Sequence, residues 1–288
     1  MNATATHSIG VTARDTDWSA VREDLRYYGT VVVHGRLADW RPRACERGAL
    51  RALLGRDWAR YCAIGQPEVR DRYAASRRLL KHTAAAALGA EASDLELAYG
   101  PTGRPYLRGC DQIDISLSHT EDLLVVGLTS RGLIGVDAER ADRKIYRRGL
   151  ARLACTPHER TMLAGLAERD RNPNLVRLWT LKEAYSKAIG QGLQFRFQEF
   201  GFGLGPGGGT VRLNRPDGTV GAGDEWSLRT LLLDSGGTAF VVSVAVYDIG
   251  LGRTLDTEIT TMLDAEAVGA IQRALDAERA PRSQCLDD

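Results

Sequence analysis

Apolar residues recur along the chain first at helical spacing and later at the spacing of strands. Helical spacing covers Arg43–Leu54 and Pro67–Gly89, and the longer segment has proline at its first position and glycine at its end. After a first strand at Thr30–His34, strand-like periodicity begins at Leu95, and the predicted strands are Leu95–Tyr99, Ile113–Leu117, Leu123–Thr129, Leu133–Val136, Val211–Leu213, Trp226–Leu233 and Ala239–Tyr247. Helix followed by strands occurs twice, which predicts an α+β protein of two similar lobes that meet near residues 130–140.

A further helix is predicted in the stretch 179–192, which reads W-T-L-K-E-A-Y-S-K-A-I-G-Q-G. We expect Asn172 to cap its start and Pro173 to occupy its first position. Gly190 or Gly192 suits the left-handed turn that ends a helix.

One side of this helix carries Glu183 and Lys187, which 3.6 residues per turn bring close together. As an exposed ion pair they would stabilise the helix by only about a few tenths of a kcal/mol. Asp137 and Glu139, however, lie two apart at the end of a predicted strand, so both carboxylates leave on one face. Such a D-x-E tripeptide is common in exposed turns, but together with Glu183 it predicts a site for a hard cation such as Mg²⁺.

Basic residues follow one line of the helix Pro67–Gly89, where Arg70, Arg77 and Lys81 are spaced i, i+7 and i+11. A solvated basic face and a surface for a bound polyanion are both compatible with this stripe. Arg104 in a turn-rich loop and His119 could extend a phosphate-binding surface, although a lone histidine is more often structural.

The same pattern gives the domain organisation. We expect residues 1–17 to form a mobile arm, because they show no period. Residues 18–132 form an N-terminal lobe and residues 133–250 a C-terminal lobe with the metal site. Residues 251–288 contain a final amphipathic helix and a tail.

Composition excludes several classes of protein. The formal net charge is +1, so no overall field favours nucleic acid as a partner. The five cysteines are scattered without a C-x-x-C pair, which argues against a zinc site or disulfide framework and favours a reducing cytoplasm. No signal peptide is recognisable, and no apolar run approaches the ~20 residues of a membrane helix. The sequence therefore predicts a cytoplasmic protein that does not enter a membrane.

Four motifs occur in an informative order along the chain. They are Gly103-Arg104-Pro105, Ser116-Leu117-Ser118-His119-Thr120, Ile134-Gly135-Val136-Asp137-Ala138-Glu139 and the block Trp179–Leu193. Together they resemble the 4′-phosphopantetheinyl transferase superfamily, in its larger single-chain class of the surfactin-synthetase-activating type. The resemblance spans about residues 67–247.

The resemblance implies two related lobes about a pseudo-two-fold axis, with coenzyme A between them. It implies a Mg²⁺-dependent transfer of 4′-phosphopantetheine to a serine of an acyl- or peptidyl-carrier protein, with release of adenosine 3′,5′-bisphosphate. Glu183 would be the general base and Lys187 would stabilise the pyrophosphate. The residues implied to hold the metal are Asp137, Glu139 and Glu183, and those implied to contact coenzyme A are Arg70, Arg77, Lys81, Arg104, Ser118, His119, Asp137, Glu183 and Lys187.

The implied partners are carrier domains of fatty-acid, polyketide or nonribosomal peptide synthases, and a monomer is expected. Arg78 is an alternative to Arg77 in the early basic group. The basic linker 140–148 suits an acidic carrier surface. A catalytically inactive coenzyme A or carrier-binding module of the same fold is the main alternative. A generic metal-dependent phosphohydrolase would be expected to carry His- and Asp-rich clusters that this sequence lacks.

Overall fold

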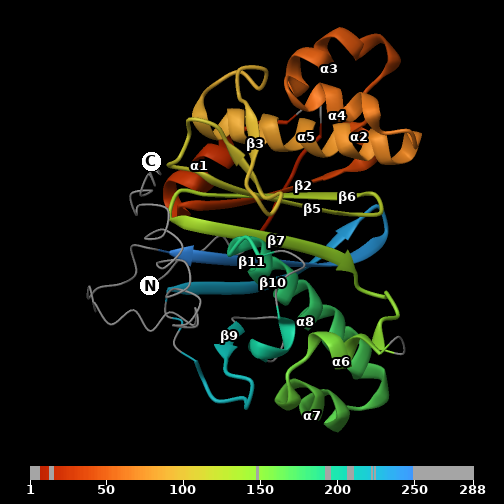
Figure 1. The fold of residues 1–288 in the computed structure, drawn as a ribbon, viewed down its shortest axis with the longest axis vertical. Coiled ribbons are helices and arrows are strands. Elements are labelled where there is room, and N and C mark those ends of the chain that lie inside the picture. The colour runs from red at the N-terminus through yellow and green to blue at the C-terminus, as the bar shows by residue number, and fades with distance from the viewer. Residues whose placement is uncertain are drawn as a thin grey trace, which may run out of the picture. The chain divides into compact units, whose positions relative to one another are not determined.

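Two large sheets, the helices that cover them and a small two-stranded sheet make up the architecture of the described residues (Figure 1). The computed structural model describes residues 7–12, 16–146, 149–191, 196–205, 211–221, 223 and 225–248. Elements before residue 130 are β1 (Ile9–Gly10), α1 (Ser19–Tyr28), β2 (Thr30–Arg36), α2 (Leu37–Trp40), the 3₁₀-helix η1 (Ala44–Glu46), α3 (Arg47–Leu54), α4 (Asp57–Ala63), α5 (Pro67–Leu88), β3 (Leu97–Tyr99), β4 (Pro105–Leu107), β5 (Asp114–Thr120) and β6 (Leu123–Thr129). Later elements are β7 (Gly132–Arg140), α6 (Leu150–Ala154), α7 (Pro157–Gly165), α8 (Glu168–Ala188), the 3₁₀-helix η4 (Phe197–Glu199), β8 (Gly201–Leu204), β9 (Val211–Asn214), β10 (Trp226–Ser235) and β11 (Thr238–Asp248).

The two sheets repeat one topology. The first has the strand order β1-β2-β6-β5 and the second β7-β11-β10-β9-β8. In each sheet a strand is followed by a long helix and then by a hairpin, and the second hairpin strand pairs antiparallel with both other strands of the repeat. The long helices α5 and α8 have 22 and 21 residues. The predicted α+β class with two similar lobes is confirmed.

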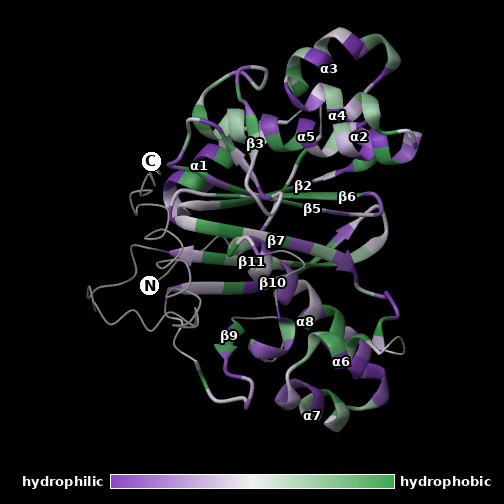
Figure 2. Ribbon diagram, in the orientation of Figure 1, coloured by the Kyte–Doolittle hydropathy of each residue, from purple (hydrophilic) through white to green (hydrophobic). Residues whose placement is uncertain are grey.

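Alternation along the strands divides the apolar residues between two cores. Val31 and Val33 of β2 pack with α5 residues such as Leu79, whereas Val32 packs with Val136 of the other sheet. Strand β6 is therefore buried at every position, and Figure 2 shows its apolar character. On the second sheet, α8 packs against β7 and β11. The result is a helix–sheet–sheet–helix arrangement, in which β5 of the first sheet and β7 of the second lie side by side at the junction of the sheets.

Helix boundaries agree with the sequence at α5 but not at the start of α8. Helix α5 begins at Pro67 and ends before Gly89, whose φ is +67°. Helix α8 begins at Glu168, so the predicted start at Pro173 is wrong. Pro173 lies inside the helix, and the Asn172 side chain instead accepts the backbone N–H groups of residues 145 and 146 at 2.9 and 3.1 Å.

The left-handed turn after α8 is at Gly190, with φ +72°. The N–H of Gln191 donates to the Ser186 carbonyl at 3.1 Å, which satisfies the last turn of the helix. Gly192, the alternative position for this turn, lies outside the described residues.

Part of the predicted N-terminal arm is ordered. Ile9 and Gly10 pair parallel with β2, and Val11 is buried in the first core. The sheet changes between β6 and β7, close to the predicted division at residue 132, but the chain to Leu251 packs as one unit and the division stays a prediction. The predicted helix 263–280 lies outside the described residues. Among the helices that the structure describes, none has the length and apolarity to cross a bilayer.

Candidate active site

Strands β5 and β7 belong to different sheets and are joined by side chains instead of a backbone ladder. Polar side chains at alternate positions of β5 accept the backbone N–H groups of β7. These bonds are Ile134 N–H to Asp114 (2.7 Å), Val136 N–H to Ser116 (3.0 Å) and Ala138 N–H to Ser118 (3.3 Å). The seam between the repeats is therefore polar, and it fixes the side chains of both strands against each other.

Asp137 lies at the centre of this seam with 8% of its surface exposed. Its Oδ1 accepts the Ser118 hydroxyl at 2.8 Å and the Lys187 ammonium at 2.6 Å. Lys187 also donates to the Val136 carbonyl at 3.1 Å. One carboxylate oxygen therefore connects β5, β7 and α8.

Gly135 allows α8 to approach β7 closely enough for this contact. A Cβ at Gly135 would lie 1.8 Å from the Ala184 carbonyl oxygen and 2.6 Å from the Ala188 nitrogen, both backbone atoms. Any side chain would therefore push the helix away from the strand. The glycine brings the α8 side chains Glu183 and Lys187 within reach of Asp137.

Glu183 is half-buried on α8 beside this pair. Burial raises the pKa of Glu183, the negative charge of Asp137 raises it further, and Lys187 opposes both effects. Two carboxylates that repel each other in a partly buried site are a donor set that a divalent cation would stabilise.

Glu139 is held in other contacts, although it shares a face of β7 with Asp137. Its carboxylate accepts the Thr120 hydroxyl at 3.2 Å and the Arg140 N–H at 2.9 Å, and it forms an ion pair with Arg143. Within the described residues, no three acid, histidine or cysteine side chains converge as a metal site. The predicted three-carboxylate site of Asp137, Glu139 and Glu183 is therefore not preformed. The Arg143 guanidinium occupies the position at Glu139 where a metal ion would bind.

The described site therefore offers Mg²⁺ two carboxylate ligands and not three. Mg²⁺ is commonly held by one or two carboxylates, with waters and substrate phosphate oxygens as the other ligands. Asp137 and Glu183 supply that donor set, and burial together with the charge of Asp137 raises the pKa of Glu183, which a bound cation would oppose.

A basic group lies on the other side of the seam, around His119 of β5. Desolvation lowers the pKa of His119, and the positive charges of Arg72, Lys187 and Arg77 lower it further. The Arg77 guanidinium lies 4.1 Å over the Tyr73 ring. Cations from α5 and α8 therefore gather beside the acidic pair, as an anionic ligand would require.

Sequence reasoning named Arg72 only as a residue flanking the stripe of α5, and it missed Arg60 beside this group. Arg60 lies 5.7 Å from the Tyr73 ring that also contacts Arg77. Arg60 belongs to α4, and Arg72 belongs to α5 but lies off the line of Arg70, Arg77 and Lys81 that the spacing selected. Their basic character was the available signal, and it does not distinguish them from other arginines of this region.

Lys81 and Arg70 are not part of the group. Lys81 is 2% exposed and donates to the Leu53 carbonyl, so its predicted contact with coenzyme A would first break a buried hydrogen bond. Arg70 lies 5.8 Å over the Tyr61 ring, on the α4 side of α5. Arg70, Arg77 and Lys81 therefore share one stripe of α5 but lie in three different environments.

Two other arginines have structural partners. Arg104 forms an ion pair with Asp114 and donates to the Ile134 carbonyl at 2.9 Å, so it closes the start of the β5–β7 seam. Arg78 donates to Glu46 at 3.1 Å and to the carbonyls of residues 40 and 41. Arg77 also has partners, Asp57 at 3.9 Å and the Tyr99 hydroxyl at 3.4 Å, but its charge acts on His119, which makes it the better candidate for the basic group.

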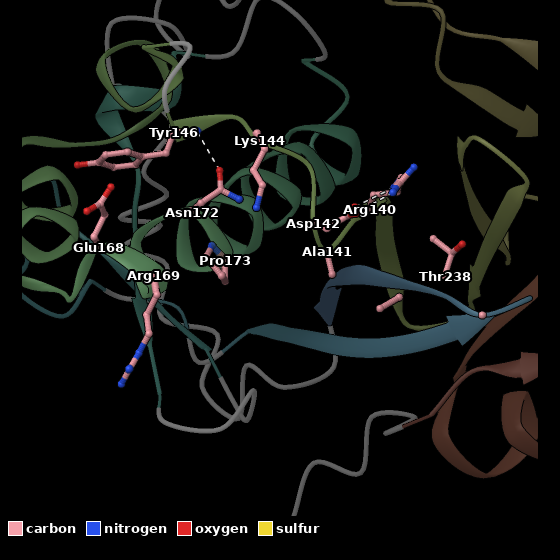
Figure 3. A pocket seen from close by; sticks show the side chains of 12 residues that line it. Arg140, Ala141, Asp142, Lys144, Tyr146, Glu168, Arg169, Asn172, Pro173 and Thr238 are labelled. Atoms are coloured by element: carbon pink, nitrogen blue, oxygen red, sulfur yellow. Dashed lines mark hydrogen bonds and ion pairs between the residues drawn. The ribbon is translucent and has the colours of Figure 1, made fainter.

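A separate open pocket of about 1000 Å³ lies between the segment after β7, the first turns of α8 and the β10–β11 turn (Figure 3). Its charged side chains are the basic Arg140, Lys144 and Arg169 and the acidic Asp142 and Glu168, and Arg140 is paired with Asp142 at 2.7 Å. The Asn172 side chain accepts the Tyr146 N–H at 3.1 Å and so ties the segment to α8. This pocket contains part of the basic linker that the sequence singled out.

Comparison with known proteins adds independent information. Residues 133–230 match the family model of the 4′-phosphopantetheinyl transferase superfamily. A putative 4′-phosphopantetheinyl transferase of Synechocystis is 29% identical over 143 residues, covering 49% of this chain and 58% of the relative. The 4′-phosphopantetheinyl transferase HetI of Nostoc is 30% identical over 143 residues, covering 49% and 60%. The match thus spans less than two thirds of the length of these two relatives.

A longer match is to a phosphopantetheinyl transferase of Thraustochytrium, which is 31% identical over 194 residues, covering 62% of this chain and 67% of the relative. A similar solved structure is a holo-(acyl-carrier-protein) synthase of Bacillus anthracis in complex with coenzyme A (3′,5′-ADP). The alignment covers 41% of this chain and 96% of the synthase chain, at 21% sequence identity and a TM-score of 0.32. The family match to residues 133–230 includes β7 and α8, which carry Asp137, Glu183 and Lys187. The chain belongs to the 4′-phosphopantetheinyl transferase superfamily.

Proposed function

We propose that this protein transfers the 4′-phosphopantetheine group of coenzyme A to a serine of a carrier protein. The observation that carries the proposal is the arrangement of Asp137, Glu183 and Lys187 across β7 and α8, beside the basic group around His119. A phosphate ester with several negative charges needs both neutralisation and positioning, and phosphoryl transfer relies on these more than on covalent catalysis.

In this reaction the carrier serine oxygen attacks the β-phosphorus of coenzyme A. The new P–O bond joins phosphopantetheine to the carrier, and the bond to the bridging oxygen breaks so that adenosine 3′,5′-bisphosphate leaves. Glu183 would accept the serine proton, since its raised pKa makes it a stronger base than an exposed glutamate. Lys187 would stabilise charge on the pyrophosphate, and Ser118 would orient Asp137 through their 2.8 Å hydrogen bond.

The nucleotide end of coenzyme A would lie against the basic group of Arg72, Arg77 and His119. Guanidinium groups suit a terminal phosphate because they donate two parallel hydrogen bonds. Asp137 and Glu183 would hold Mg²⁺, which when bound supplies further neutralisation of the pyrophosphate. A third ligand from Glu139 would require its ion pair with Arg143 to open.

The carrier would approach over the basic linker, next to the pocket in Figure 3. Carrier domains of fatty-acid, polyketide or nonribosomal peptide synthases are the proposed partners, and the enzyme would act as a monomer. A cytoplasmic setting agrees with the unpaired cysteines of the described chain, Cys45, Cys62, Cys110 and Cys155.

Incubation with coenzyme A, Mg²⁺ and apo carrier proteins should add the mass of one phosphopantetheine to the carrier serine. Mass spectrometry of fatty-acid, polyketide and peptide carriers side by side would measure this and rank the partners. A carrier whose serine is replaced by alanine is the control and should gain no mass. If coenzyme A binds but none of these carriers is modified, the protein is a binding module and the proposed activity is wrong.

The position of the carrier predicts a second result in the same assay. Lys144→Glu with Arg169→Glu should raise the carrier KM about tenfold, because charge reversal weakens steering of an acidic partner. The KM for coenzyme A should stay unchanged, since neither side chain is in the Asp137 site. Arg212→Glu, at an exposed position of β9, is the matched control. An unchanged carrier KM in the double variant would place the carrier elsewhere.

A further inference from the structure

An arginine-rich helical region lies in the first half of the chain, and most of it is apart from the candidate active site. Between residues 41 and 72 the sequence contains eight arginines, four acids and no lysine, whereas the whole chain has a net charge of +1. The positive charge of this region is therefore local. Nothing in the proposed reaction uses most of these arginines.

Three of the arginines recur every four residues, one directly before η1 and two on α3. Arg43, Arg47 and Arg51 are all exposed. The opposite side of α3 is apolar, with Leu50, Leu53 and Leu54 buried. In the described chain, none of Arg43, Arg47 and Arg51 forms an ion pair. We define the arginine face as Arg43, Arg47, Arg51 and Arg70 with Trp58 and Tyr61.

Aromatic rings fix two of these guanidinium groups. Trp58 and Tyr61 stack on each other with ring centroids 5.2 Å apart and an interplanar angle of 30°. The Arg47 guanidinium lies 5.7 Å from the Trp58 ring, and that of Arg70 lies 5.8 Å from the Tyr61 ring. Cation–π contact uses the face of a guanidinium and leaves its N–H edge able to donate to an anion.

Two hollows flank Trp58 on this surface. One, of about 460 Å³, is lined by Arg43, Arg47, Tyr61 and Arg70, together with Asp71. The other, of about 600 Å³, is lined by Arg51 and Arg56. Trp58 lines both, so the arginine face is continuous. The Arg70 Nε is buried there without a hydrogen-bond acceptor, as a donor that awaits a ligand would be.

The geometry narrows the class of ligand. Trp58 and Tyr61 cover each other, and each also carries a guanidinium, which leaves little ring surface on which a nucleobase could stack. Arg47 and Arg51 of α3 are separated by about 6 Å along the helix axis, which is also the spacing of carboxylates at every fourth position of an acidic helix. Guanidinium groups bind carboxylates through two hydrogen bonds, which a set of lysines would not do.

From this we infer that the arginine face is a docking surface for an acidic helical segment of a protein partner. The inference stands independently of the proposed reaction, because it uses Arg43, side chains of α3 and α4 and the first turn of α5, and not the β5–β7 seam. Its contacts would be salt-dependent ion pairs at the rim of the two hollows.

The test uses the full-length protein and a synthetic alanine-rich helical peptide with glutamate at every fourth position. Fluorescence anisotropy at low salt should show binding, and a peptide of equal composition with its glutamates distributed around the helix should bind more weakly. Arg43→Ala/Arg47→Ala/Arg51→Ala should weaken binding about tenfold or more. The matched control Arg22→Ala/Arg26→Ala/Arg212→Ala removes three exposed arginines elsewhere and should bind as the parent does.

A single variant guards against misfolding of the triple variant. Arg47→Lys keeps the charge but loses the planar fork over Trp58, and it should weaken peptide binding measurably. Equal binding by the parent and both triple variants would overturn the inference. Tighter binding of single-stranded DNA than of the peptide would also overturn it. A higher KM for an isolated carrier in the arginine-face triple variant would assign the surface to carrier recognition and overturn its independence from the reaction.

Discussion

Glu183→Gln should slow phosphopantetheine transfer by about 100-fold or more, because the amide cannot accept the serine proton. The substitution conserves shape, and the Gly135 contact that positions α8 involves backbone atoms and stays intact. The loss should therefore appear mainly in kcat, with a much smaller change in the dissociation constant of coenzyme A. Transfer rates at saturating carrier and calorimetric titration with coenzyme A measure the two quantities separately.

The matched control for this result is Glu199→Gln, which neutralises a surface glutamate paired with Arg196. That variant should transfer at the parental rate. If Glu183→Gln were as fast as the parent, the role of Glu183 in proton transfer would be wrong. Equal losses of rate and coenzyme A affinity would indicate that the residue serves binding and not the chemical step.

Local patterns in the sequence predicted those parts of the fold that local forces determine. Helix α5 was placed correctly because Pro67 and Gly89 act on their own backbone conformations. Strand β6 was placed at its observed bounds because burial on both faces gives a continuous apolar run. Glu183 and Lys187 were placed on one side of a helix by its period alone.

Local patterns do not predict which neighbouring element each face of a helix will contact. Arg70, Arg77 and Lys81 share a stripe of α5, yet each lies in a different environment. That outcome depends on α3, α4 and the β5–β7 seam, which tertiary packing places around α5. Spacing therefore identifies candidates without separating a ligand contact from a buried hydrogen bond.

Charge pairing was also beyond the sequence, because the partners lie at unpredictable separations. Asp137 pairs with Lys187, 50 residues away, whereas Glu139 pairs with Arg143 four residues away. A D-x-E pattern predicts that both carboxylates share a face, as they do on β7. It does not predict which cation each will meet. The predicted start of α8 was wrong for a related reason. The Asn172 side chain accepts the N–H groups of residues 145 and 146, which are distant in sequence, from a position inside the helix.

A buried ion pair joins the C-terminal half of α8 to neighbouring elements, one residue before Glu183. Lys182 and Glu159 are 0% and 1% exposed, and their charged atoms are 2.8 Å apart. The Lys182 ammonium also donates to the carbonyls of Phe197 and Phe200 at 2.7 and 2.5 Å. Glu159 in turn accepts the N–H groups of Thr156 and Phe202, both at 2.8 Å. The pair thus joins α7, α8 and the segment 197–202.

Lys182→Met should lower the free energy of unfolding by about 3–5 kcal/mol, because it leaves the Glu159 carboxylate buried without a counter-ion and two carbonyls without a donor. Guanidinium denaturation at neutral pH measures this as a lower midpoint. Lys144→Met, which removes an exposed lysine, is the matched control and should change stability by less than about 0.5 kcal/mol.

The explanation by an unpaired charge has its own test in a double-mutant cycle. Lys182→Met/Glu159→Gln removes both charges, so its loss of stability should be smaller than the sum of the two single losses by about 1 kcal/mol or more. Strict additivity would show that Lys182 stabilises α8 through the carbonyls of residues 197 and 200 and not through its charge. Because Lys182 precedes Glu183 on the same helix, the double variant also tests the site. If packing alone positions Glu183, the transfer rate of each variant should follow its stability, and the double variant should lose less activity than the two single losses combined.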